Sequence, residues 1–286
     1  MDNIKYFFQF LFIKLLFLIF KTIGLNVSRL ISGKLFSIIG PLFRSKKIIE
    51  KNLSIAFPSI TNLEKKDLIQ DMWTYYGKIL AEYVFMKEFR FGKLNNKIKV
   101  NGQDILEKIN LDKEPVIFIS GHFDNFELMA MHLDKSNIKL AAIYRPLNNK
   151  FLNPLMENIR KKYICKNQIK KGISGTKELL KQFKLGSSIA LMIDQRVSEG
   201  IRCKFFEKDA FTTSIPAQFI KKFNCKIVPI HIERTHDDDF KICIYKPIKF
   251  GNTESINSIT QNLNYLLEEM IKKNIHQWIW THNRWK

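Results

Sequence analysis

The residues best suited to chemistry stand in SGHFDNFELM (120–129), where His122 precedes Glu127 by five positions. A neutral imidazole, with an ordinary pKa of about 6.5, can remove a proton from an attacking hydroxyl near pH 7. A carboxylate that holds the other ring nitrogen fixes the tautomer and stabilises the imidazolium that forms. We therefore interpret His122 as a general base and Glu127 as the carboxylate that orients it. A hydrogen-bonded structural histidine is the alternative.

The local context supports this interpretation more than the spacing does. With six histidines and 27 acidic residues in 286, about 0.6 such pairs are expected by chance. However, His122 follows the apolar run PVIFIS, and Gly121 permits a tight exit from a strand. Asp124 or Asn125 is suited to cap a helix with Glu127 in its first turn. This order predicts that His122 lies at the carboxyl edge of a sheet.

No serine nucleophile accompanies the pair. The chain has no G-x-S-x-G sequence, and Ser120 falls inside the predicted strand. Direct attack by an external hydroxyl is therefore favoured over a covalent intermediate.

Short apolar runs alternate with helix-like stretches from about residue 97 onward. The predicted strands are 115–120, 138–144, 187–194, 225–232 and 240–246, and the predicted helices between them are 126–133, 151–163, 174–183 and 214–223. This alternation predicts an α/β fold with a central, mostly parallel sheet flanked by helices. The last strand follows the turn-like THDDD and is expected to pair antiparallel with its predecessor. A further helix is predicted over 61–86.

The N-terminal residues 4–20 form an almost continuous apolar stretch, interrupted by Gln9 and Lys14. As a helix the stretch spans about 26 Å, just short of the roughly 30 Å hydrocarbon layer. It either crosses a membrane with tilt or lies in the interface, and both arrangements predict a membrane anchor. A cleaved signal peptide lacks its small-x-small site here, and a buried first helix of a soluble domain is the remaining alternative.

An amphipathic pattern continues from the anchor through Phe43, and basic residues follow it at Arg44, Lys46 and Lys47, with Lys34 before them. These charges predict that the body stays on the cytoplasmic side. We divide the chain into an N-terminal anchor and amphipathic segment, 1–45, and a single α/β domain, 46–286.

Lysine and arginine number 47 against 27 acidic residues, a net charge of +20. Such a field favours nucleic acid, an anionic bilayer, or acidic proteins and phosphorylated substrates. No RNP, helix-turn-helix or zinc-finger pattern supports nucleic acid, although a non-catalytic basic membrane protein remains an alternative. The cysteines, at 165, 203, 225 and 243, lack zinc spacing and are expected to be free. We interpret His236 and the aspartates 237–239 as a polar turn, in preference to a metal site.

The stretch GHFDNFE resembles the signature block of the lipid A biosynthesis acyltransferases, the late lauroyl/myristoyl transferases of the lysophospholipid acyltransferase superfamily, which share H-x-x-x-x-D/E. Further blocks are similar and in order: YRPLNN (144–149), NPLMENIR (153–160), ALMIDQR (190–196), FF (205–206), AFTT (210–213) and HQWIWTHNRWK (276–286). The family block commonly reads GHFGNWE, so Asp124 and Phe126 are departures. Asp124 either raises the pKa of His122 or caps the helix.

The resemblance implies transfer of a fatty acyl group from acyl carrier protein to a hydroxyl of a lipid A precursor of the Kdo2-lipid IVA type, at the cytoplasmic face of the inner membrane. It implies no cofactor and no metal. Arg145 and Arg160 match family blocks and suit bidentate phosphate or carboxylate contacts, unless they are only solvated. Asp194 and Gln195 are expected at the same sheet edge as His122, where they shape the site.

The nearest alternative keeps the enzyme class and changes the substrate. The acceptor would then be another lysophospholipid or glycolipid, with either acyl-ACP or acyl-CoA as donor. In the C-terminal block, Trp278 and Trp280 fit either a bilayer interface or a strand that packs inward, and we favour inward packing.

Overall fold

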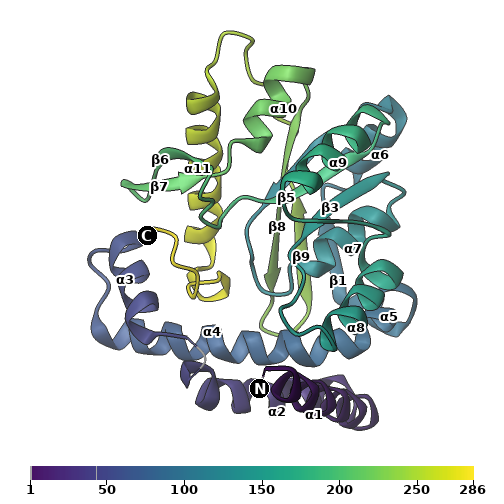
Figure 1. The fold of residues 1–286 in the computed structure, drawn as a ribbon, viewed down its shortest axis with the longest axis vertical. Helices are drawn as coiled ribbons and strands as arrows, with labels where there is room; N and C mark the ends of the chain where they lie inside the picture. Colours follow the sequence, from purple (N-terminus) through teal and green to yellow (C-terminus); the bar gives the residue numbers. More distant parts are fainter. Residues whose placement is uncertain (1, 43) are drawn as a thin grey trace.

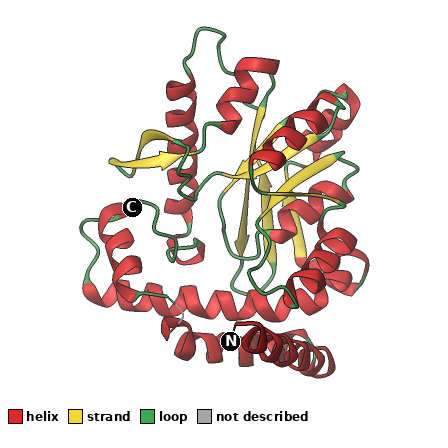
Figure 2. Ribbon diagram, viewed as in Figure 1, coloured by secondary structure: helices red, strands yellow, loops and turns green. Residues whose placement is uncertain are grey.

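The computed structural model describes residues 2–42 and 44–286, so the predicted pattern at Phe43 lies outside the described residues. Figures 1 and 2 show a sheet enclosed by helices, with two N-terminal helices set apart at one end. The α-helices are α1 (Asp2–Ile23), α2 (Leu25–Ile39), α3 (Lys46–Ala56), α4 (Asn62–Glu82), α5 (Met86–Phe91), α6 (Gln103–Asp112), α7 (Glu127–Lys135), α8 (Leu152–Ile159), α9 (Ile173–Lys184), α10 (Ile215–Phe223) and α11 (Ile256–Lys273).

The central sheet has the strand order β1-β9-β8-β2-β5-β3-β4. All neighbouring strands pair parallel except β8 and β9, which are antiparallel. The predicted α/β class, the mostly parallel sheet and the antiparallel last strand are confirmed. The strands are β1 (Ile98–Asn101), β2 (Ile117–Ser120), β3 (Leu140–Tyr144), β4 (Asn167–Lys170), β5 (Ser188–Met192), β8 (Ile227–Arg234) and β9 (Phe240–Ile244).

Four strands are not predicted by the sequence patterns. Edge strands β1 and β4 read IKVN and NQIK, which are short and carry polar residues because one side of an edge strand meets solvent. The other two, β6 (Ile201–Phe205) and β7 (Lys208–Thr212), form a separate antiparallel hairpin that packs on α11. Its turn residues Phe206 and Glu207 both have positive φ, which no glycine signals in the sequence.

Helix α4 crosses the end of the sheet toward which β8 points, which is the carboxyl end of the parallel strands (Figure 1). Its N-terminus has a capping box, in which Thr61 accepts from the Glu64 amide while the Glu64 side chain accepts from the Thr61 amide. On its outer side α4 packs closely against α2. Gly77 permits this approach, because a side-chain carbon at that position would overlap the Ser32 carbonyl oxygen.

The N-terminal helices lie on the far side of α4 from the sheet (Figure 1). Within the described residues, one helix, Asn3–Ile23, is long and apolar enough to cross a membrane, and 6% of its apolar window is buried. It is the candidate membrane anchor. Helix α3 begins at Lys46, while the division of the chain at residue 45 stays a prediction.

The C-terminal tryptophans pack inward. Trp278 and Trp280 are buried and meet edge to face with ring centres 4.6 Å apart. Trp278 makes one isolated antiparallel bridge to Phe123, so the segment lies against the loop that follows β2 without forming a full strand. Inward packing is therefore confirmed.

Candidate active site

Two neighbouring strands bring His122 and Asp194 together. Strands β2 and β5 are parallel, with Ser120 opposite Met192, and the Ile193 amide donates to the Ser120 carbonyl. His122 and Asp194 each lie two residues beyond this pair, so the register that joins the strands also sets the two side chains opposite each other.

Asp194 holds His122 at two points, the ring and the backbone amide. Its Oδ1 lies 2.8 Å from His122 Nδ1, and its Oδ2 accepts from the His122 backbone amide at 2.8 Å. The indole of Trp278 also donates to Oδ2, at 2.9 Å. Because a carboxylate only accepts, Nδ1 carries the proton and the lone pair of the neutral ring is on Nε2.

The electrostatics favour a charged pair. Burial alone would lower the pKa of His122, but the charge and hydrogen bond of Asp194 outweigh it and raise the pKa above 6.5. Burial would likewise raise the pKa of Asp194, yet the interaction with His122 holds it below the ordinary value. The site therefore stabilises the imidazolium that forms when His122 takes a proton.

Glu127 makes different contacts from those we predicted. Among the described residues, no hydrogen bond joins Glu127 to His122, and the orienting carboxylate is Asp194. Glu127 is the first residue of α7 and is buried. Its Oε1 lies 2.6 Å from Arg160 Nη2 and accepts from Tyr83 Oη. Glu127 therefore bonds to the residues that directly follow α4 and α8, whereas the imidazole bonds to Asp194, which follows β5.

Arg160, Tyr83 and Glu127 form a compact hydrogen-bonded group in which Tyr83 and Glu127 are buried and Arg160 is 14% exposed. Arg160 also donates to Tyr83 Oη at 3.0 Å. Burial would lower the pKa of Arg160, but the charge of Glu127 raises it. Burial and the charge of Glu127 keep the pKa of Tyr83 raised, so Tyr83 stays protonated. The negative charge of Glu127 also raises the pKa of His122 without contact.

Asp124 neither caps α7 nor touches the imidazole by a described hydrogen bond. Its carboxylate accepts from Arg234 at 2.6 and 2.9 Å and from the Asn125 amide at 2.6 Å. Phe126 occupies the cap position of α7, where no side chain supplies a capping bond. Asp124 has φ +35°, a left-handed conformation that aspartate tolerates better than most residues. This conformation explains why glycine also suits the position.

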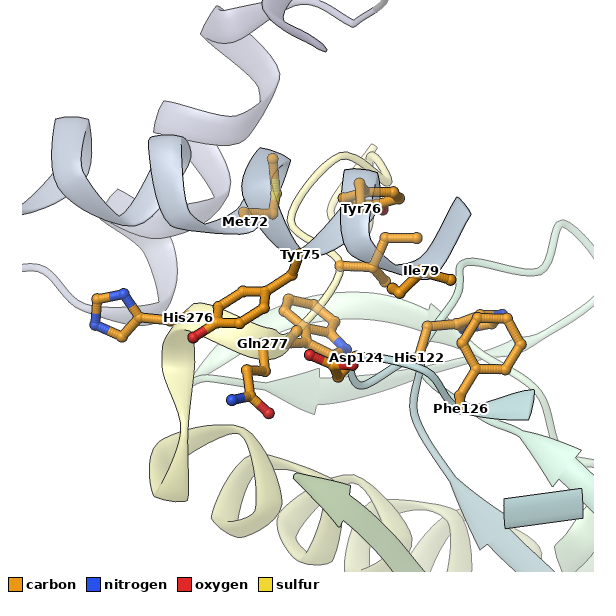
Figure 3. A pocket seen from close by; sticks show the side chains of 11 residues that line it. Met72, Tyr75, Tyr76, Ile79, His122, Asp124, Phe126, His276 and Gln277 are labelled. Carbon is orange, nitrogen blue, oxygen red and sulfur yellow. The ribbon is translucent and has the colours of Figure 1, made fainter. Parts of the chain in front are cut away.

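A small cavity opens between α4 and the loop after β2. In Figure 3, Met72, Tyr76 and Ile79 of α4 lie on one side and His122 and Phe126 on the other. Its volume of about 30 Å³ has room for about one water molecule. The cavity is too small for a larger ligand, and the His122 side chain is 19% exposed.

The remaining predicted residues lie at the same edge with fewer contacts. Arg145 directly follows β3 and is exposed, and Gln195 follows Asp194 and is partly buried. Within residues 2–42 and 44–286, neither hydrogen-bonds to the His122 pair. In the turn between β8 and β9, Asp238 pairs with Lys78 and Asp239 pairs with Lys97, as expected for a polar turn.

Sequence reasoning missed the roles of Trp278 and Tyr83. Both lie far from residue 122 along the chain, and only packing brings them to the site. The role of Asp194 had a usable signal, because the predicted strand 187–194 ends at Asp194 and the predicted strand 115–120 ends just before His122.

The whole chain, residues 1–286, matches the family model described as bacterial lipid A biosynthesis acyltransferase. A lipid A biosynthesis acyltransferase of Haemophilus influenzae is 22% identical over 259 residues, which cover 89% of this chain and 81% of the relative. The lipid A biosynthesis palmitoleoyltransferase of Escherichia coli is 21% identical over 86% of this chain and 80% of its own length. The myristoyltransferase of the same organism is 21% identical over 46% of this chain and 40% of its own length.

Proposed function

Because the chain belongs to the bacterial lipid A biosynthesis acyltransferase family and is an O-acyltransferase, we propose that it moves a fatty acyl chain from acyl carrier protein to a hydroxyl of a Kdo2-lipid IVA-type precursor. The observation that carries the proposal is the hydrogen bond between His122 Nδ1 and Asp194, which leaves Nε2 free to accept a proton. The lipid A acceptor follows from the names of the family and its relatives.

In this mechanism His122 is the general base. Nε2 takes the proton of the acceptor hydroxyl as its oxygen attacks the thioester carbonyl. The C–O bond forms, the C–S bond breaks, and the thiolate leaves with the electron pair. His122 then returns its proton to the thiolate. Asp194 holds the ring through Nδ1 and stabilises the imidazolium between these two steps.

Glu127 supports the base electrostatically and positions Arg160 in this scheme. The carboxylate of Glu127 lies 2.6 Å from Nη2 of Arg160 and so fixes the position of the guanidinium group. We propose that Arg160, together with exposed Arg145 and neighbouring Gln195, contacts the phosphates or the acyl carbonyl of the substrates.

The positive charge of the chain supports the proposal in two ways. A net charge of +20 attracts the anionic acceptor and an acidic carrier protein. Exposed basic residues near the anchor, including Lys34 and Lys46, favour a position on the cytoplasmic face of the inner membrane.

The test is transfer by the purified chain in detergent, with acyl-ACP and a lipid A precursor, followed by mass spectrometry of the lipid. We expect one added acyl chain with the parent protein and none with His122→Ala. His132→Gln is the matched control, because His132 lies on α7 and bonds to Gln103, away from Asp194. Equal turnover by His122→Ala would overturn the proposed base.

The substrates are tested separately. Replacing acyl-ACP by acyl-CoA should abolish or greatly reduce transfer. Lipid extracts from cells with and without the gene should differ by one secondary acyl chain on lipid A. Unchanged lipid A with altered phospholipids would overturn the proposed acceptor.

A further inference from the structure

Helix α1 is docked along its length on the rest of the protein. Its less exposed side chains recur at helical spacing, at positions 6, 10, 13, 17 and 20. The amide of Asn149, in the segment after β3, donates to the Tyr6 carbonyl at 2.9 Å and to Gln9 Oε1 at 3.2 Å. Phe151 packs edge to face on Phe7, with ring centres 5.6 Å apart. Contacts near the start of α1 thus join those of Phe17 and Phe20 near its end.

The burial pattern of helix α2 is the reverse of that of a helix on the surface of a soluble domain. Toward α4 it buries small, polar and charged residues, namely Ser28, Arg29, Ser32 and Gly33, with Leu25. Arg29 makes a buried ion pair with Glu82 at 2.6 Å. Away from α4 it exposes large apolar side chains: Val27, Leu30, Ile31, Leu35 and Ile38. Water does not stabilise such an arrangement, whereas an apolar phase on the outer side does.

Both helices expose large apolar side chains together with a few lysines. On α1 the exposed apolar side chains are Ile4, Phe7, Phe8, Leu11, Phe12, Leu15, Leu18 and Ile19. The exposed basic residues of this region are Lys5, Lys14, Lys21 and Lys34, which suit anionic headgroups. Figure 1 shows both helices at the same end of the molecule, beneath α4.

We propose that α1 and α2 together form one surface that lies on the bilayer, with α1 in the interface and not across it. A spanning α1 would have to give up the Asn149 hydrogen bonds and the buried stripe that ends at Phe20. The two helices lie on the outer side of α4, whose inner side faces His122. The proposed function further requires that a lipid acceptor reach the His122 ring from this end of the molecule. This inference does not depend on the chemistry proposed above.

The first experiment tests whether α1 crosses. In a Cys243→Ser background, Asn3→Cys marks the start of α1 and Asp112→Cys marks the exposed end of α6 on the body. A membrane-impermeant maleimide is applied to intact spheroplasts and to lysed ones. We expect both positions to behave alike, with labelling only after lysis. Labelling of Asn3→Cys in intact spheroplasts, with Asp112→Cys protected, would overturn the proposal because it places the two on opposite sides.

The second experiment tests the contact surface. Leu30→Glu with Ile38→Glu places two carboxylates on the outer side of α2, and Leu111→Glu with Ile173→Glu is the control on exposed apolar residues elsewhere. Binding of the full-length protein to vesicles of equal phosphatidylethanolamine and phosphatidylglycerol is measured by flotation. We expect the α2 variant to bind at least about tenfold more weakly, since two charges must then leave water, and the control to bind as the parent does.

Equal flotation of the α2 variant and the parent would overturn the proposed surface, as would failure of the parent to bind these vesicles. The variant's circular dichroism and proteolysis pattern must match the parent's, so that unfolding is excluded. His122→Ala should float like the parent. A chain that binds vesicles as proposed but transfers no acyl group would therefore contradict the proposed function alone.

Discussion

Two groups of buried charge lie near the carboxyl end of the sheet, and they differ in access to solvent. In the first, His122 and Asp194 pair with side chains 19% and 0% exposed. In the second, which we call the sealed cluster, Arg29, Glu82, Arg234 and Asp124 pair at 2.6 Å with no side chain more than 2% exposed.

The two groups also differ in whether a charged or titratable atom remains available to a substrate. Both oxygens of Glu82 accept from Arg234, and both oxygens of Asp124 do as well. The carboxylates of the sealed cluster are therefore fully occupied, and the two Arg29 nitrogens without a partner, Nη1 and Nη2, are buried. His122 uses one ring nitrogen for Asp194 and keeps the other for a proton. A buried, charged residue is thus a candidate for chemistry only where one of its atoms can reach a substrate.

The largest effect expected from this comparison is that of His122→Ala. We expect acyl transfer to fall by at least about 10³-fold, toward the upper range for general-base catalysis, while the unfolding midpoint changes little. Rates from mass spectrometry and a thermal unfolding curve in detergent measure the two quantities. A large loss of stability with activity retained would place His122 in the same class as the sealed cluster.

Substitutions in the sealed cluster should lower the stability of the fold. Glu82→Ala leaves Arg29 and Arg234 without their shared carboxylate, and we expect a loss of about 3–5 kcal/mol in the free energy of unfolding. Burial raises the pKa of Glu82, but Arg234 and Arg29 together lower it, in keeping with a stabilising pair. Chemical denaturation in detergent measures the change.

The control for this variant is Glu88→Ala, on the exposed side of α5, with an expected change within about 0.5 kcal/mol. If both variants unfold at the same denaturant concentration, the sealed cluster does not stabilise the fold.

Asp194→Asn should reduce transfer by roughly 10²-fold and also move its pH dependence. In the proposed mechanism neutral His122 is the active form, so the rate should rise with pH through the pKa of the ring. In the parent this midpoint lies above 6.5 because Asp194 raises the pKa against the effect of burial. Asparagine removes that charge while burial remains, so the midpoint should move to lower pH. A rate–pH profile with an unchanged midpoint would contradict the assigned role of Asp194.

The smallest difference is expected between two substitutions of Asp124, which both break its buried pair with Arg234. Asp124→Gly removes the bonds to Arg234 but accepts φ +35° without strain, whereas Asp124→Ala removes the same bonds and also strains the backbone. We expect the alanine variant to be less stable than the glycine variant by about 1 kcal/mol. Paired denaturation curves measure this difference, and equal stabilities would mean that the left-handed backbone is not a constraint here.

Local patterns predicted much of the fold. Strands of the sheet interior are continuous apolar runs because both of their faces are buried, and the helices between them show their own periodicity. The edge strands β1 and β4 and the β6–β7 hairpin escaped prediction because half-exposed strands carry polar residues. Which carboxylate holds His122 was also predicted wrongly. Glu127 is near in sequence, but the start of α7 directs it toward Arg160.

By itself the sequence determined the α/β class, the place of His122 at a strand end and the apolar character of the first helix. These depend on residue types at short spacing, and short-range geometry converts them directly into structure. Only the tertiary structure decided that Asp194 holds the imidazole and is itself held by Trp278, that Asp124 belongs to the sealed cluster, and that α1 lies docked against the body. Each of these depends on strand register or helix packing between residues distant in the chain, where many arrangements satisfy the same local pattern and the packed core selects one.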